Sequence, residues 1–231
     1  MKNINRILLV ALLAFICLNV HAQEYVTQTK ESLTNMTPQD ALQKLKDGNE
    51  RFLSGKLVER NLNEQVKQTA HGQYPFAIVL SCMDSRSPSE FIFDQGIGDI
   101  FNDRVAGNVV DEDILGSLEF ACKITGSKLI LVLGHTNCGA IKGACDDVKM
   151  GNLTNLLSKI KPAIEAVPIV NGERNSKNKD FVDKVSKENV FLAIQNINDR
   201  SPILKEMIDK GEIKIVGAMY DVETGKVTFY E

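Results

Sequence analysis

Short runs of consecutive apolar residues dominate the centre of the chain. Residues 76–80, and residues 128–134 after the initial Lys128, each form a run that is typical of a strand buried on both faces of a sheet. Residues 99–105 predict a further strand, and residues 114–124 have the spacing of a helix that ends at Gly126. Strand, helix and strand in this order predict a parallel sheet covered by helices.

The segment before these runs has a helical pattern. A helix is predicted to begin at Thr37, because a hydroxyl cap followed by Pro38 is a typical helix start, and to end at Gly55. A second, polar helix is predicted over residues 61–71, whereas residues 23–36 lack periodicity and predict a flexible arm. The apolar stripe of the first helix comprises Ala41, Leu42, Leu45, Phe52 and Leu53.

The last third of the chain returns to a helical pattern. Residues 152–210 predict helices interrupted at prolines, with a polar surface loop over residues 171–179. Residues 212–222 predict a strand, and Thr224-Gly225 turns the chain into a last short strand over residues 226–230. Because no long linker or repeat interrupts this order, we expect a single domain over residues 37–231.

The first 22 residues resemble an export signal rather than part of the fold. Lys2 and Arg6 precede an apolar run over residues 7–20, and Val20-His21-Ala22 predicts cleavage before Gln23. The run is shorter than the ~20 residues that span a bilayer, so a secretory signal is favoured over a membrane anchor. We therefore expect a secreted protein, periplasmic in a Gram-negative source.

The balance of charged residues indicates which kinds of binding partner are disfavoured. Loss of Lys2 and Arg6 with the signal leaves 25 of the 27 basic residues against 30 acidic ones. This mildly acidic balance does not favour binding to nucleic acid or to an anionic membrane. The remaining sequence contains no second apolar stretch long enough to cross a membrane.

Two polar motifs follow directly after the two strongest predicted strands. Residues 81–88 (SCMDSRSP) follow the first, and residues 134–140 (GHTNCGA) begin where the second ends. Because the carboxyl ends of parallel strands meet at one edge of a sheet, we expect Cys82, His135 and Cys138 to converge there.

Two thiolates and one imidazole match the ligand preference of zinc. Three protein ligands leave a fourth position for water, as in catalytic zinc sites, and zinc lowers the pKa of that water to about 7. His71 and His135 are the only histidines outside the signal, so a three-histidine site is excluded. We expect His71 to lie at the surface.

Asp84 and Arg86 are further candidate functional residues, since they lie within four positions of Cys82. The Asp84 carboxylate could occupy the fourth zinc position, or it could pair with a bidentate Arg86 and accept a hydrogen bond from the zinc-bound hydroxide. These two arrangements exclude each other and would form an on/off switch. Cys122 and Cys145 lack such a context; we expect Cys122 in the core, with a disulfide between the two as the less favoured alternative.

The pattern Cys82-x-Asp84-x-Arg86 with His135-x-x-Cys138-Gly139 resembles the β-class carbonic anhydrases. Residues 93–101, 104–108 and 116–120 resemble that family too, and the similarity runs from about Thr37 to Asp221. The resemblance implies an α/β fold with a mainly parallel sheet of four to five strands, flanked by helices and preceded by an N-terminal helical arm. It also implies a homodimer or dimer-based oligomer.

The same resemblance implies roles for individual residues. Cys82, His135 and Cys138 would bind one zinc ion per subunit, and Asp84 with Arg86 would form the catalytic dyad. Gln95 and Gly139 would lie at the substrate site. Because the chain contains no tryptophan, the regulatory bicarbonate pocket of some family members is not expected.

The expected reaction is attack of hydroxide on carbon dioxide, giving bicarbonate and a proton. One alternative keeps the fold and hydrolyses another small heterocumulene such as carbon disulfide. A second alternative is a zinc-binding protein without turnover, which the retained Asp84 and Arg86 argue against. A redox protein is disfavoured because the chain has no Cys-x-x-Cys.

Overall fold

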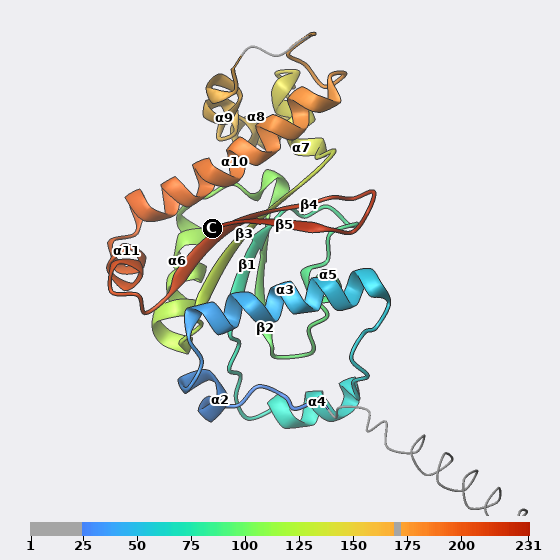
Figure 1. The fold of residues 1–231 in the computed structure, drawn as a ribbon. Coiled ribbons are helices and arrows are strands. Elements are labelled where there is room, and N and C mark those ends of the chain that lie inside the picture. The colour runs from blue at the N-terminus through green and yellow to red at the C-terminus, as the bar shows by residue number, and fades with distance from the viewer. Residues whose placement is uncertain (1–24, 169–171) are drawn as a thin grey trace, which may run out of the picture.

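The structure is a computed structural model that describes residues 25–168 and 172–231 (Figure 1). The expected export signal and its cleavage site lie outside the described residues. At the centre is a five-stranded sheet in the order β2-β1-β3-β4-β5. The first four strands are mutually parallel, and β5 runs antiparallel to β4, so the expected mainly parallel sheet is confirmed. Its strands are β1 (Ala77–Ser81), β2 (Ile100–Arg104), β3 (Leu129–His135), β4 (Lys214–Tyr220) and β5 (Val227–Tyr230).

Helices cover both faces of the sheet. On one side lies α3 (Pro38–Ser54), and on the other lie α6 (Glu112–Glu119) and α10 (Lys179–Arg200) (Figure 1). Side chains alternate between the two faces along each strand. In β1, Val79 packs in the layer with α3, whereas Leu80 packs in the layer with α6 and α10. This two-sided burial explains why the central strands are continuously apolar.

A third group of helices lies beyond the carboxyl ends of the strands (Figure 1). It comprises α7 (Gly139–Cys145), α8 (Gly151–Ser158) and α9 (Lys161–Ala166), which pack against the first half of α10. Cys82 and Cys138 belong to the apolar cluster that these helices enclose. The predicted ligand-bearing turns therefore lie under a helical cover.

The N-terminal segment is more ordered than its composition indicated. We expected a flexible arm over residues 23–36, but α2 (Lys30–Thr34) forms within it. Thr29 and Ser32 make a reciprocal capping box, and Leu33 is buried in the layer that contains α3. One buried leucine produces no periodic stripe, so a helix this short has no sequence signal.

The other helices largely follow the predictions. Thr37 caps α3 and Gly55 ends it in the left-handed region, at φ 67°. The polar helix is α4 (Leu62–Thr69), and α11 (Pro202–Asp209) begins at a proline as expected. Within the described ranges, no helix is both long and apolar enough to cross a membrane. Short elements without a clear pattern are α5 (Ser89–Ile92) and the 3-10 turn η1 (Ala106–Asn108).

The helix predicted over residues 114–124 differs in its second half. It continues after α6 as a π-helix, η2 (Phe120–Thr125), before Gly126 closes it at φ 92°. The wider turn buries Ala121 and Cys122 and leaves Phe120 half exposed. Cys122 is therefore a core residue, as expected.

Candidate metal centre

Three predicted ligands converge at the carboxyl edge of the sheet. Cys82 directly follows β1, and His135 is the last residue of β3, its parallel neighbour. A tight turn follows, in which Asn137 adopts a positive φ of 57°, and Cys138 then precedes the first residue of α7. The adjacent strand ends and this turn bring together residues that lie more than fifty positions apart.

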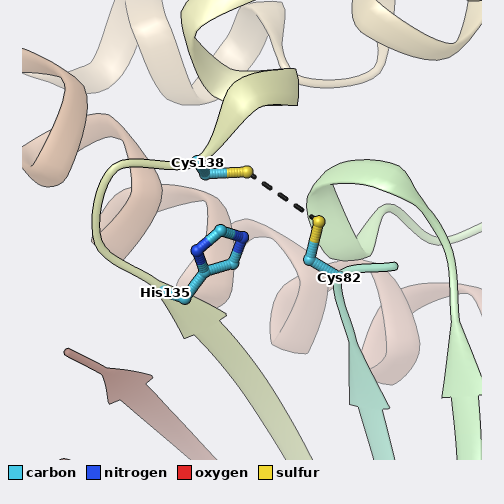
Figure 2. Close-up of side chains that lie close together, drawn as sticks. All are labelled: Cys82, His135 and Cys138. Carbon is cyan, nitrogen blue, oxygen red and sulfur yellow. Dashed lines mark hydrogen bonds between the residues drawn. The ribbon is translucent and has the colours of Figure 1, made fainter. Parts of the chain in front are cut away.

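The three donor atoms form one compact group, and their side chains point toward one another (Figure 2). All lie within 4.8 Å of one another, and the two sulfur atoms are 3.9 Å apart. Cys82, His135 and Cys138 are only 5%, 2% and 1% exposed. Both cysteines are free, so the sulfurs are available as ligands.

In the imidazole of His135, one nitrogen makes a hydrogen bond and the other is available to bind a metal ion. Nδ1 lies 2.9 Å from the Thr136 carbonyl oxygen, a contact in which Nδ1–H donates and Nε2 carries a lone pair. Nε2 is buried and has no hydrogen-bond partner. An orphaned acceptor beside two buried thiols is costly unless a cation binds there. This donor set therefore fits zinc.

A hydrogen bond links the two thiols, with the sulfur atoms 3.9 Å apart. The hydrogen bond with Cys138 is the main factor that lowers the pKa of Cys82. The same hydrogen bond, together with burial, raises the pKa of Cys138. Both cysteines would bind a divalent cation as thiolates, so metal binding would release protons from this pair.

Asp84 and Arg86 form a bidentate ion pair beside the three ligands. Arg86 donates from Nε to Oδ1 at 2.9 Å and from Nη2 to Oδ2 at 2.8 Å, and its backbone N–H also bonds Oδ1. Hydrogen bonding to Arg86 lowers the pKa of Asp84 to about 2. The second carboxylate oxygen lies 3.8 Å from His135 Nε2. We expected Asp84 either to occupy the fourth zinc position or to pair with Arg86. The structure has Asp84 paired with Arg86.

Arg104 is a site residue that sequence reasoning did not single out. Its Nε donates to the Cys82 carbonyl oxygen at 3.2 Å, and its Nη2 donates to the Asp84 carbonyl oxygen at 2.6 Å. One guanidinium at the end of β2 thus fixes the backbone of the loop that carries Cys82 and Asp84. Arg104 belongs to a segment that resembled the family, but its position in sequence did not indicate this contact.

The two residues expected at the substrate site lie in different surroundings. Gly139 is exposed at the start of α7, and a Cβ atom added there would have no neighbour within 4 Å. Gln95 lies beside Gly48 of α3 and donates a hydrogen bond to the Phe93 carbonyl oxygen. No hydrogen bond among the described residues links Gln95 to the three ligands. Its role in substrate binding stays a prediction.

The remaining cysteines and the second histidine lie outside this centre. Cys122 is buried in the core between the sheet and α10, and Cys145 is partly buried at the end of α7. Both are free, so the disfavoured disulfide is not formed. His71 is exposed, as expected.

Comparison with known proteins identifies the family. Residues 77–227 match the family model for carbonic anhydrase. Carbonic anhydrase 2 of Mycobacterium tuberculosis is 35% identical over 197 residues, which cover 84% of this chain and 93% of that protein. A carbonic anhydrase of Mycolicibacterium smegmatis is 32% identical over 201 residues, covering 84% and 94%.

Solved structures agree with this assignment. A Coccomyxa β-carbonic anhydrase in complex with acetazolamide aligns with a TM-score of 0.63 at 26% identity, over 72% of this chain and 77% of that one. A tetrameric β-carbonic anhydrase of Sordaria macrospora shares the fold, with a TM-score of 0.61 at 24% identity over 72% and 89%. The matched family is a family of lyases. The chain belongs to the β-class carbonic anhydrase family.

Proposed function

We propose that this protein catalyses the reversible hydration of carbon dioxide to bicarbonate and a proton, with zinc held by Cys82, His135 and Cys138. The observation that carries the proposal is the buried group of two thiols and one orphaned imidazole nitrogen within 4.8 Å. Membership of the carbonic anhydrase family supports the choice of substrate.

The zinc would supply Lewis acidity, which makes a water-derived nucleophile available near neutral pH. The chain's own residues then bind and orient the reactants. Asp84 accepts a hydrogen bond from the attacking water, and Arg86 keeps the carboxylate ionised and turned toward His135. The proton that the reaction releases passes to the solvent buffer.

Apolar packing around the ligands restricts bulk water. Val109 and Ile141 belong to the same buried cluster as Cys82 and Cys138. Carbon dioxide is small and apolar, so it can enter such surroundings more readily than an ion can. Gly139 directly follows the last ligand, and we propose that the substrate lies beside it.

A homodimer or dimer-based oligomer, exported from the cytoplasm, is part of the proposal. Related Sordaria enzymes are described as tetrameric, and the N-terminal 22 residues have the pattern of a secretory signal. Light scattering after size exclusion tests the assembly. N-terminal sequencing of exported protein tests cleavage before Gln23, and retention of residues 1–22 would contradict export by this signal.

The function is tested by metal analysis coupled to a carbon dioxide hydration assay. Cys82→Ser should lose zinc and activity together, because a serine hydroxyl is a poor zinc ligand. Cys145→Ser changes a free cysteine outside the centre and should keep both. Full activity in metal-free Cys82→Ser protein would refute the proposal, and parallel assays with carbon disulfide would identify the alternative substrate.

A further inference from the structure

The sulfur of Cys82 accepts a hydrogen bond from a tight turn that contains Gly107. The Gly107 N–H donates to Cys82 Sγ at 3.3 Å. Gly107 lies within η1 at φ 70°, and an added Cβ atom there would stand 2.8 Å from Ile160 Cδ1. Both the positive φ and the close packing favour glycine. A peptide N–H at this position stabilises negative charge on the sulfur.

Asn189 of α10 holds this turn from its other side. The Asn189 Nδ2 donates to the Gly107 carbonyl oxygen at 2.7 Å, across 82 positions of sequence. Asn189 is 2% exposed, and Gly107 is also buried. A buried side chain that bonds a distant backbone carbonyl contributes more than local helix stability. It fixes where the Gly107 peptide lies relative to Cys82.

The same helix contacts the second ligand-bearing turn. Asp183 Oδ1 accepts a hydrogen bond of 2.9 Å from the Asn137 N–H, between His135 and Cys138. α10 therefore contacts the turn that bonds Cys82 and the turn that carries the other two ligands. Asn189 and Asp183 are its two polar contacts to these turns.

We propose that Asn189 is a positioning residue of the metal centre. By holding Gly107, it keeps the Gly107 N–H on the Cys82 sulfur, which partly neutralises the thiolate and sets how strongly it donates to the metal. The inference rests on the proposed zinc site. Such indirect partners of a metal ligand change metal affinity by about 10- to 100-fold.

Cobalt substitution tests the role directly, because thiolate ligands give Co²⁺ a charge-transfer band. Asn189→Ala should bind Co²⁺ and Zn²⁺ about tenfold more weakly, because the Gly107 turn no longer holds Cys82 in place for the metal. Its charge-transfer band should move to lower energy, because a sulfur without the hydrogen bond gives up its electron more readily. Asn198→Ala is the matched control, since among the described residues the Asn198 amide bonds the Ile194 carbonyl of its own helix and no residue of the metal centre. It should change neither property.

The outcomes separate this inference from the proposed function. If the parent protein shows no thiolate-to-cobalt band, the metal site itself is wrong. If the parent shows the band and Asn189→Ala matches Asn198→Ala in both affinity and band position, the positioning role is wrong. Partial unfolding lowers the band without moving it. Should Asn189→Ala not fold, Asn189→Ser, which keeps a shorter donor, should shift the band in the same direction, and an unshifted band would overturn the inference.

Discussion

The Arg104 guanidinium donates a hydrogen bond of 2.6 Å to the backbone carbonyl of Asp84. Together with its bond to the Cys82 carbonyl, this contact links the end of β2 to the loop after β1. The loop carries both a metal ligand and the carboxylate proposed to orient water, so its placement sets the distance between the two.

Arg104→Met should therefore reduce kcat/KM while much of the zinc is retained. A displacement of about 1 Å can lower activity by up to about 100-fold, and we expect a loss of 10- to 100-fold. Steady-state hydration kinetics and metal analysis measure the two effects. Arg200→Met is the control, because Arg200 also bonds a backbone carbonyl, that of Val110. Equal activity in the two variants would contradict a positioning role for Arg104.

Replacing the Asp84 carboxylate should separate metal binding from turnover. Asp84→Asn should keep zinc and lower kcat/KM by about 100-fold, the usual effect of losing one proton-handling group. Arg86→Lys keeps the positive charge but loses the bidentate fork, so its loss should be smaller yet clear. Stopped-flow hydration assays compare the variants. An Asp84→Asn protein with parental kcat/KM would exclude the carboxylate from the reaction.

Gly134, the residue before His135, is packed too closely for any side chain. An added Cβ atom would lie 2.6 Å from Val190 Cγ2 and 2.7 Å from Met219 Sδ. Gly134→Ala should lower the free energy of unfolding by about 1–3 kcal/mol and weaken zinc binding, because β3 must shift. Urea denaturation and metal titration measure these changes.

The matched control for that substitution is Gly116→Ala in α6. A Cβ atom at Gly116 meets no neighbour within 4 Å, and alanine favours helix, so stability should rise by up to about 1 kcal/mol. A destabilisation equal to that of Gly134→Ala would show that the effect is not steric.

Tyr25 anchors the N-terminal segment to the start of β2. Its hydroxyl donates to the fully buried carboxylate of Asp99. Burial is the main factor that raises the tyrosine pKa, and the charge of Asp99 adds to it. Tyr25→Phe leaves that carboxylate short of a partner and should lower the free energy of unfolding by about 1–3 kcal/mol. Tyr74→Phe is the control, since the structure gives the Tyr74 hydroxyl no hydrogen bond. Equal denaturation midpoints would contradict the anchoring role.

Asp103 makes stability depend on pH. Burial is the main factor that raises its pKa, and the charge of Asp111 adds to it, while Ser117 partly offsets both. One of its oxygens is buried without a partner. Because the folded state holds this proton more tightly, its contribution is fully present below the unfolded pKa of about 3.9 and is lost as pH rises through the folded pKa.

Asp103→Asn should therefore be more stable than the parent protein at pH 7, with the difference shrinking as the pH approaches 3. Urea denaturation at several pH values measures it. Asp113→Asn changes an exposed aspartate and should show no such trend. A stability difference that does not vary with pH would contradict this assignment.

Local patterns in the sequence were sufficient to predict the parallel sheet and the types of the metal-ligand residues. Residues 76–80 and 129–134 are apolar throughout because both faces of β1 and β3 are covered, and this pattern is visible without coordinates. Cys82, His135 and Cys138 follow those runs directly, so parallel topology alone predicted that they meet.

Only the tertiary structure decided how the metal centre and the N-terminal segment are held in place. Three hydrogen bonds do this, and they are made by Arg104, Asn189 and Tyr25 to residues that lie 20 to 82 positions away. Their acceptors are backbone carbonyl groups and one carboxylate, and nothing in the sequence indicates which residue bonds them. Hydrophobic periodicity reports the environment of a side chain, whereas a single directed hydrogen bond depends on where two distant backbones come to lie. That placement follows from packing of the whole domain.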